Sequence, residues 1–267
     1  MTAVLTEVPE IIGIDKAALL RFLMRDRLAA AYPIGDLDPR FSDFCRWWGH
    51  SGTDGELDGI LLLYTGLRSP VVLTLGSGDA VERLLAQAAP ELPTRFYAHV
   101  MGDHVGALEH GWAARRLRPM VRMGLSRSAF IAPSEDLRGV VPVTHQDTSE
   151  LALLYRFYPD NFFEPYQLES GYYYGVREGG HLVSVAGVHV YSRAHDIAAI
   201  GNVVTHPEHR SKGHSRRCTA RLCQALFETV SLVALNVDRE NVAARRIYQR
   251  LGFTDHLEYL EGFVETR

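Results

Sequence analysis

The sequence predicts a mixed α/β fold in which a largely antiparallel sheet is flanked by helices, preceded by a second, N-terminal α/β domain. Two β-rich runs, 172–176 and 181–191, are joined through Gly179 and Gly180, which tolerate the positive φ of a tight hairpin. The next β-rich run, 197–204, leads through a polar loop into a pattern of helical spacing. We therefore expect antiparallel strands that lead into a strand–helix–strand unit.

The other elements of this part of the chain follow from the same patterns. Apolar residues of the helix after the polar loop form one stripe: Cys218, Leu222, Ala225, Leu226 and Thr229. The remaining expected elements are a strand at 140–144, helices at 148–158 and 241–251, and strands at 232–237 and about 257–264. Together they suffice for one α/β domain.

A segment rich in proline, glycine and charge, 131–142, separates this part from the first half. We therefore expect domains at 1–135 and 136–267. In the first half the patterns predict a helix at 16–31 that ends before Pro33, strands at 57–64, 70–75 and 94–100, and a helix at 79–89. No chemistry is indicated there, and whether this divergent domain is a degenerate copy of the same fold stays open.

Composition excludes several classes of function. The chain has 267 residues, 46% hydrophobic and 22% charged, with a net charge of -4, so we expect no nucleic-acid or membrane partner. An acidic N-terminus is unlike a signal peptide, and no apolar run approaches the roughly 20 residues of a membrane span. The three cysteines form no CxxC pair, which favours buried thiols and a reducing, cytoplasmic location.

The polar loop 210–215 has the composition of an anion site. It lies at a helix N-terminus, where backbone N–H groups lack helical partners and the dipoles sum to roughly +0.5 charge. Gly213 allows close approach of an anion, and Arg210, Lys212 and Arg216 add positive potential. Neither GxxxxGK[ST] nor a GxGxxG after a strand occurs, which disfavours nucleoside triphosphates and dinucleotides. The loop is predicted to hold a pyrophosphate.

The segment 205–215, THPEHRSKGHS, resembles the coenzyme A loop V-x-P-x-x-R-x-x-G-x-[GA] of GNAT-type N-acetyltransferases. Thr205 replaces the usual apolar residue, and Ser215 stands where Gly or Ala is usual. Ser211 stands where many members have Gly; a positive φ there would cost of order 1 kcal/mol. The resemblance covers about the last 125 residues.

A second segment, LNVDRENVAARRIYQRLGF, is similar to the family's later motif. Six residues fall at the expected places: Asn236, Asn241, Ala243, Tyr248, Gly252 and Phe253. Asn241 suits a helix N-cap, and Gly252 suits the position just after the helix. Both motifs occur in the family's order, which supports a GNAT-type fold for this half of the chain.

The resemblance implies acetyl transfer from acetyl-coenzyme A, as co-substrate, to an amine. It assigns polarisation of the thioester carbonyl to backbone N–H groups around 203–205, beside a bulge expected at Gly201 and Asn202. The implied cofactor-binding residues are Val203, Val204, Thr205, Arg210, Ser211, Lys212, Gly213, His214, Ser215, Arg216, Asn236 and Asn241.

Tyr248 occupies the family position of the catalytic acid that protonates the departing thiolate. Ala243, Ile247 and Leu251 are spaced as a core stripe of the last helix, which predicts that Tyr248 points about 100° away from the core, toward the loop. A purely structural tyrosine is the alternative.

The general base is not identified by the sequence, because no side chain in 197–205 is ionisable apart from the hydroxyl of Thr205. Four residues lie in segments that line the acceptor side in the family: Asp160, Glu164, His189 and Tyr191. Each is also compatible with a surface role, so none is preferred.

No metal is expected. His206, His209 and His214 cluster near the loop, but no H-x-x-x-H helix or cysteine partner accompanies them, which favours solvated histidines.

An aromatic-rich region lies where the family places its acceptor pocket: Phe157, Tyr158, Phe162, Phe163, Tyr166 and Tyr172 to Tyr174. It favours a partly apolar small-molecule amine, or a terminal amine, as substrate. Two alternatives remain open, a coenzyme A-binding module with weak or lost catalysis and an active role for the N-terminal half. A homodimer is also left open.

Overall fold

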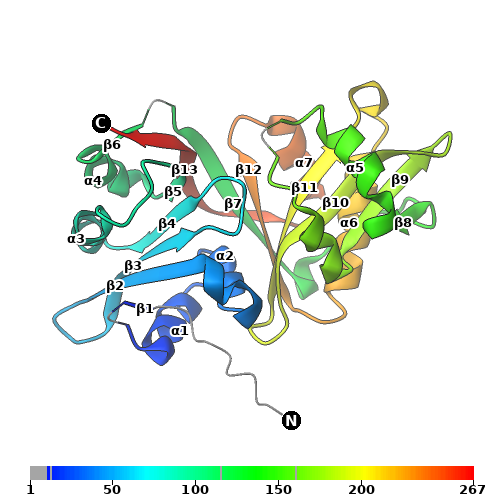
Figure 1. The fold of residues 1–267 in the computed structure, drawn as a ribbon. Coiled ribbons are helices and arrows are strands. Elements are labelled where there is room, and N and C mark those ends of the chain that lie inside the picture. The colour runs from blue at the N-terminus through cyan, green and yellow to red at the C-terminus, as the bar shows by residue number, and fades with distance from the viewer. Residues whose placement is uncertain (1–10, 13, 115, 160) are drawn as a thin grey trace, which may run out of the picture. The chain divides into compact units, whose positions relative to one another are not determined.

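The chain forms two compact units, shown in the computed structural model of Figure 1. The structure describes residues 11–12, 14–114, 116–159 and 161–267. Unit 1 comprises Met1–Val121 and Leu257–Arg267, and unit 2 comprises Arg122–His256. This division differs from the predicted boundary at 131–142, because the last strand of the chain pairs with a strand of the first half.

Unit 1 is built on a sheet with the strand order β1-β2-β3-β4-β5-β13, and β6 also pairs with β13. Its elements are β1 (Ile11–Ile12), α1 (Lys16–Met24), α2 (Ala31–Asp36), β2 (Cys45–Ser51), β3 (Leu57–Tyr64), β4 (Val71–Gly76), α3 (Gly78–Ala88), β5 (Arg95–Val100), α4 (Val105–Glu109), β6 (Trp112–Ala114) and the end of β13 (Thr254–Thr266). Antiparallel pairing joins β2, β3 and β4, whereas β4 and β5 are parallel. Helix α3 connects these two parallel strands.

Most predicted elements of the first half are confirmed, as β3, β4, β5 and α3. The helix expected at 16–31 is wrong in extent, because α1 ends at Met24 and a separate helix, α2, begins at Ala31. Pro33 lies in the first turn of α2, where the missing N–H has no intrahelical acceptor to lose. The sequence did not predict strand β2. Its neighbouring residues Trp47 and Trp48 are both buried, so the strand lacks the alternation of apolar and polar residues that reveals a half-buried strand.

Unit 2 is built on a sheet with the order β7-β12-β11-β10-β9-β8. Its elements are the end of β7 (Arg118–Ser126), β8 (Val140–Pro142), α5 (Thr148–Tyr155), β9 (Tyr173–Glu178), β10 (His181–Ser192), β11 (Ile197–Thr205), α6 (His214–Leu226), β12 (Leu232–Asp238), α7 (Val242–Arg250) and the start of β13. Strands β8 to β11 are antiparallel neighbours, and β11 and β12 are parallel. The predicted hairpin is confirmed, with Gly179 and Gly180 at φ 59° and 86°.

Different helices cover the two faces of the unit 2 sheet. Consecutive side chains of a strand point to opposite faces. Tyr173 contacts Phe163, which stacks on Tyr155 of α5, with ring centroids 5.9 and 4.9 Å apart. Tyr174 lies under the guanidinium of Arg221 of α6, 4.9 Å from the ring centroid. Helices α5 and α6 therefore pack on opposite faces (Figure 1).

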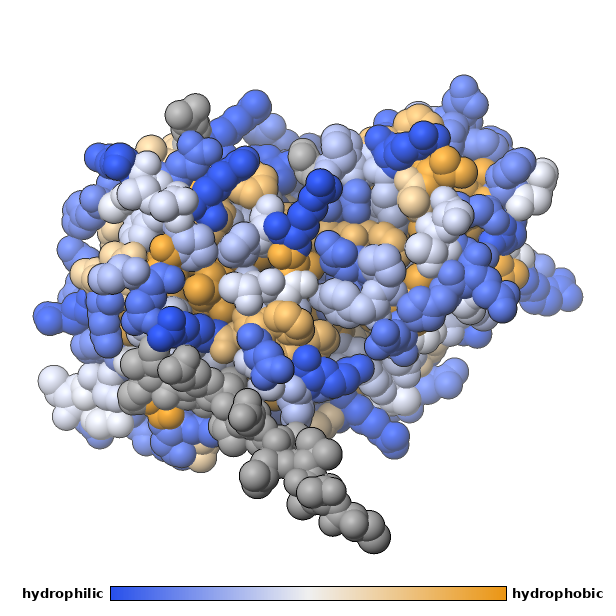
Figure 2. Space-filling model, viewed as in Figure 1, coloured by the Kyte–Doolittle hydropathy of each residue, from blue (hydrophilic) through white to orange (hydrophobic). Residues whose placement is uncertain are grey.

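Helix α5 buries Leu151 and Leu154 against the sheet but exposes other apolar side chains. Leu153 is 52% exposed, and Phe157, just after the helix, is 49% exposed. Figure 2 shows hydrophobic atoms over this helix among mainly hydrophilic neighbours. Scattered exposed apolar residues are common, and no helix in the described residues is long and apolar enough to cross a membrane.

The two units repeat one order of elements. Three antiparallel strands are followed by a helix and by a strand parallel to the third, as β2-β3-β4-α3-β5 and as β9-β10-β11-α6-β12. The units differ where the third strand meets the helix. In unit 1, β4 ends at Gly76 and α3 begins at Gly78, and the Ser77 hydroxyl accepts the backbone N–H of Ala80 at 3.3 Å. In unit 2, the loop 206–213 separates the strand from the helix.

Glu261 of β13 is a buried carboxylate, 6% exposed, inside unit 1. The hydroxyls of Tyr97 and Tyr259 donate hydrogen bonds to its two oxygens at 2.8 and 3.0 Å, and His99 Nε2 lies 3.2 Å away. Burial raises the pKa of a carboxyl group, but the contact with His99 and the two tyrosine hydrogen bonds outweigh it. They hold the pKa of Glu261 at about 2.

Glu261→Gln is expected to lower the free energy of unfolding by on the order of 3 kcal/mol at about pH 6. Because the folded-state pKa is depressed, this stabilisation is present above the unfolded-state pKa of about 4.3 and is lost as the pH falls toward about 2. Urea unfolding at about pH 6 and pH 3 measures it, and the difference from the native chain should shrink at the lower pH.

Glu265→Gln is the matched control, since Glu265 lies on the same strand in a surface ion pair with Arg95. Exposed pairs contribute little, so this variant should unfold almost as the native chain does at both pH values. A pH-independent effect of Glu261→Gln would show that the charge of the carboxylate is not what stabilises unit 1.

Candidate functional site

The parallel strands β11 and β12 pair along only part of their length. Ile197 pairs with Leu232, and the ladder ends where Ile200 pairs with Leu235. Both strands continue beyond this point, β11 to Thr205 and β12 to Asp238. The two backbones therefore diverge in the middle of the sheet, which leaves main-chain groups of 201–205 and 236–238 without a partner from the facing strand.

A β-bulge lies at the start of this opening. Against β10, the register of β11 shifts between Gly201 and Val204, and Asn202 adopts a left-handed conformation with φ 52°. The bulge predicted at Gly201 and Asn202 is thus confirmed. A bulge re-aims backbone groups away from the regular ladder.

Three side chains that the sequence did not connect with Asn202 hold this bulge. Asn202 Nδ2 donates hydrogen bonds to Gln167 Oε1 and to the Tyr173 hydroxyl oxygen, both at 2.9 Å. The Tyr155 hydroxyl donates to the Asn202 carbonyl at 2.9 Å. Burial raises the pKa of both Tyr155 and Tyr173, so the phenols stay protonated. Tyr173 belonged only to the predicted aromatic region, and no sequence spacing connects Gln167 or Tyr155 with Asn202.

The loop 206–213 leads from the opening to the N-terminus of α6. Ser211 and Gly213 have positive φ, 64° and 80°, so the expected strain at Ser211 is present. No side chain caps the first turn of α6, and no acidic residue lies in it. A Cβ added to Gly213 would meet nothing within 4 Å among the described atoms. No described side chain thus accepts the first N–H groups of α6, as an anion site requires.

The basic side chains of the loop already have partners. Arg210 Nη2 donates to the Tyr158 hydroxyl at 3.0 Å, and that hydroxyl donates to the Thr205 carbonyl at 2.5 Å. Lys212 Nζ lies 2.9 Å from a carboxylate oxygen of Glu178. The hydrogen bond from Lys212 leads the causes that lower the pKa of Glu178 to about 2.

Arg216 forms an ion pair with Glu135, so the third basic side chain is also held. Positive charge is therefore fixed around the helix N-terminus while its backbone N–H groups remain available. An anion at this place would be bound mainly by the backbone.

The predicted cofactor-binding residues lie around the opening and the loop. Two of them are buried, Val204 and His214. Five are exposed: Arg210, Ser211, Lys212, Gly213 and Asn241. The other five are partly exposed: Val203, Thr205, Ser215, Arg216 and Asn236. Eleven of them lie on β11, on β12, in the loop or in the first turn of α6, and Asn241 caps α7. The expectation of solvated histidines is wrong for His214, which α6 buries at its first position.

The second predicted motif is confirmed in its backbone. Asn241 caps α7, and its Oδ1 accepts the N–H of Ala244 at 3.1 Å. Gly252 follows the helix with φ 97°, and a Cβ there would lie 2.2 Å from the carbonyl oxygen of Ala129. Asn236 lies just past the last β11–β12 pair, and its Oδ1 accepts the Nε–H of Arg122 at 2.9 Å.

The orientation predicted for Tyr248 is wrong. Ala243 is exposed, whereas Tyr248 is 7% exposed and Leu251 is fully buried, so α7 packs through Tyr248 and Leu251. The ring of Tyr248 meets Phe253 edge-to-face, with centroids 5.9 Å apart. The predicted stripe placed the buried face about one residue out of phase, because α7 has few apolar residues to define it.

Of the four candidate bases, the structure places two in other contacts. Glu164 takes part in a capping box with Gln167. Tyr191 packs on Tyr172, 4.7 Å between ring centroids, and Tyr172 is on the α6 side of the sheet, like Tyr174 two residues later. Asp160 lies outside the described residues.

His189 lies beside the opening. It forms a second irregularity, between Val188 and Val190 of β10. Its ring covers Gly201, since a Cβ on Gly201 would lie 2.6 Å from ring atoms. Gly201 pairs with Gly187, whose missing side chain is covered by the Tyr173 ring on the α5 face. The imidazole is therefore on the α5 face, next to the point where β11 and β12 separate.

Residues 143–253 match the model of the acetyltransferase (GNAT) family. This segment contains the diverging strands, the loop 206–213 and the capped helix α7. Residues 143–253 form a GNAT domain. Unit 1 lies outside the matched segment, and comparison with curated proteins gives no significant match.

Solved GNAT structures extend the likeness of fold over most of the chain. A putative GNAT acetyltransferase from Novosphingobium aromaticivorans is 18% identical, with TM-score 0.60 over 90% of this chain and 96% of its own. A GCN5-related N-acetyltransferase from Kribbella flavida is 18% identical, with TM-score 0.62 over 90% and 94%. A tandem GNAT protein from the clavulanic acid biosynthesis pathway is 16% identical, with TM-score 0.56 over 97% of each. At these identities the likeness concerns the fold alone.

Proposed function

We propose that this chain is an acetyl-coenzyme A-dependent N-acetyltransferase that acts on the amine of a small molecule or on a terminal amine. The observation that carries this proposal is the divergence of β11 and β12 after Ile200 and Leu235, beside the uncapped N-terminus of α6. Such an opening gives a thioester access to unpaired backbone N–H groups. The helix terminus beside it stabilises a pyrophosphate.

The pyrophosphate of coenzyme A would bind to the backbone of 211–216. Left-handed conformations at Ser211 and Gly213 turn successive N–H groups toward one side of the loop, as in anion-binding nests. The charges of Arg210, Lys212 and Arg216 support binding through their potential, although each side chain is held by a neighbour.

The acyl end of coenzyme A would lie between the diverging strands, where Asn236 follows the last pair on β12. The amine nitrogen attacks the thioester carbonyl, the carbon–sulfur bond breaks, and the thiolate leaves. Backbone N–H groups of 203–205 are the donors we assign to the developing oxyanion, because the bulge at Asn202 turns this stretch out of the regular ladder.

We assign removal of the amine proton to His189. Its ring lies on the α5 face against Gly201, one residue past the last β11–β12 pair, and an imidazole is the side chain that most often serves as a general base. The sequence left four alternatives, of which Glu164 and Tyr191 are placed in other contacts. Tyr248 remains the proposed acid for the thiolate, now from a buried position.

The acceptor would approach from the α5 side, where Tyr155, Phe163 and Tyr173 form a continuous aromatic row. Phe157, half-exposed, packs edge-to-face on His206 at 4.5 Å between centroids and extends this apolar rim toward the loop. A row of this kind favours an amine that carries an apolar or aromatic part.

The direct test is calorimetric titration with acetyl-coenzyme A, followed by measurement of coenzyme A release with a panel of aliphatic and aromatic amines. One binding site per chain is expected, because Ser77 and Asp79 occupy the first turn of α3 where unit 1 would hold a phosphate. Binding without turnover with any amine would favour the alternative, a coenzyme A-binding module. Absence of binding would refute both.

Tyr248→Phe is expected to lower kcat by about 10²- to 10⁴-fold with little change in the dissociation constant of acetyl-coenzyme A. The substitution keeps the ring packed on Phe253 and removes only the hydroxyl, so the variant should fold. Steady-state kinetics and calorimetry on the two proteins make the comparison. An unchanged kcat would leave Tyr248 as a packing residue.

His189→Gln is expected to lower kcat by a comparable about 10²- to 10⁴-fold and to remove the rise of kcat with pH that a titrating base produces. His181→Gln is the matched control, since His181 is an exposed histidine at the start of the same strand. The pH profile of kcat separates a base from a residue that only packs on Gly201. A variant with the native profile would exclude His189 as the base.

A further inference from the structure

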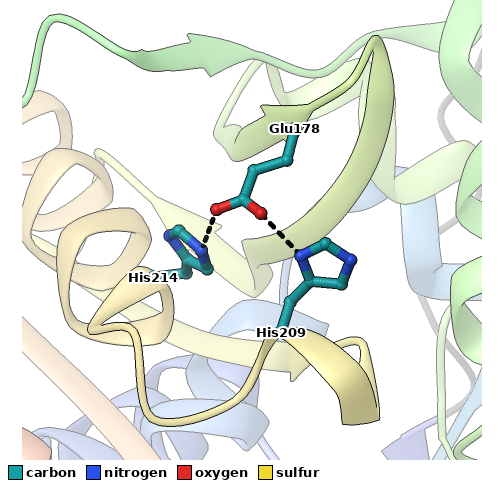
Figure 3. Close-up of side chains that lie close together, drawn as sticks. All are labelled: Glu178, His209 and His214. Atoms are coloured by element: carbon teal, nitrogen blue, oxygen red, sulfur yellow. Dashed lines mark hydrogen bonds and ion pairs between the residues drawn. The ribbon is translucent and has the colours of Figure 1, made fainter.

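Three side chains from separate segments meet beside the loop 206–213 (Figure 3). Glu178 is the last residue of β9, His209 ends the 3-10 helix Pro207–His209, and His214 is the first residue of α6. His209 Nδ1 lies 2.7 Å from one oxygen of Glu178, and His214 Nε2 lies 2.8 Å from the other. The donor atoms of all three lie within 4.8 Å of one another.

His214 is the anchor of this group. Its side chain is 6% exposed, and neither ring nitrogen makes a hydrogen bond of good geometry with the described residues, although Nε2 is directed at Glu178. Buried polar atoms in proteins nearly always have a partner. An imidazole fixed at the start of a packed helix and directed at a carboxylate is a suitable ligand for a cation placed between them.

We propose that Glu178, His209 and His214 form a binding site for a divalent transition metal, with Zn²⁺ the natural ion. Two imidazole nitrogens and one carboxylate match the donor preference of zinc. Zinc–ligand distances of about 2.0–2.2 Å place tetrahedral donors roughly 3.3–3.6 Å apart. The two separations that involve Glu178, 2.7 and 2.8 Å, are shorter than this, and all donor atoms lie within 4.8 Å of one another.

The outer part of the site can adapt and is open to water. The side chains of Glu178 and His209 are 35% and 25% exposed, so small rotations of these two bring three donors to a metal held by buried His214. Solvent supplies the remaining ligand. Mg²⁺ and Ca²⁺ prefer oxygen donors and suit this set poorly.

Lys212 competes for the same position. Its Nζ lies 2.9 Å from the Glu178 oxygen that faces His209, and 3.4 Å from His209 Nδ1. The ammonium thus stands where a metal cation would be bound. A bound metal displaces it, together with the proton on each imidazole nitrogen that becomes a ligand. Removal of Lys212 should therefore strengthen metal binding, whereas removal of a ligand should weaken it.

The test is calorimetric titration of the chelator-treated full chain with ZnCl₂ at about pH 7.5, where the ligands can deprotonate. We expect one zinc ion per chain with a micromolar or tighter dissociation constant, and no binding of MgCl₂. Glu178→Gln and His214→Gln should each weaken zinc binding by at least about tenfold. Lys212→Met should tighten it, and His181→Gln, on the same hairpin but outside the cluster, should leave it unchanged.

Absence of stoichiometric zinc binding by the native chain, or equal binding by all variants, would overturn the site. The Glu178 side chain is 35% exposed, so the Gln variant should fold. Thermal unfolding in the presence of chelator checks each protein. If His214→Gln unfolds, the other two variants test the site: Glu178→Gln should weaken zinc binding and Lys212→Met should tighten it. Nonspecific adsorption of zinc to the surface would be changed by neither substitution. The readout is metal binding alone, so failure of the proposed acetyl transfer would leave the result intact.

Discussion

The end of the ladder between β11 and β12 is the constraint on which the unit 2 site depends. Beyond Ile200 and Leu235 the strands have no main-chain partners in each other, and a sheet interior does not tolerate unpaired N–H and C=O groups without a substitute. The Tyr155 hydroxyl supplies part of that substitute, because it donates a hydrogen bond to the Asn202 carbonyl. The other main-chain groups would find partners in a ligand that enters between the strands.

The two units differ at the N-terminus of the helix that connects their parallel strands. Both units place a helix between parallel strands, yet only in unit 2 does a long loop with two left-handed residues precede that helix. In unit 1 the Ser77 hydroxyl takes a first-turn N–H, and Asp79 adds negative charge where an anion would approach. The helix N-terminus is thus capped by a side chain in unit 1 and uncapped in unit 2, although the order of elements is the same.

Local backbone requirements explain what the sequence predicted well. Gly213, Asn241 and Gly252 stand at positions whose dihedral angles or capping groups admit few residue types, so residue type together with the resemblance to the GNAT motifs predicted them. Tertiary packing decided what the sequence missed. Helix α7 has too few apolar residues to reveal which face it buries, so the orientation of Tyr248 was wrong. Glu178 reaches the loop only through the β9–β10 hairpin, a contact that no local pattern encodes.

Strand β13 is covalently continuous with the GNAT domain but belongs to unit 1 from Leu257 onward. If the polypeptide were cut at the predicted boundary, β13 would stay with the second half. Strand β5 of the first half would then lose the strand with which it pairs. It would also leave Tyr97 and His99 without the carboxylate of Glu261. Unit 1 is thus discontinuous in the sequence, and its sheet is complete only when residues before Val121 and residues after Leu257 have come together.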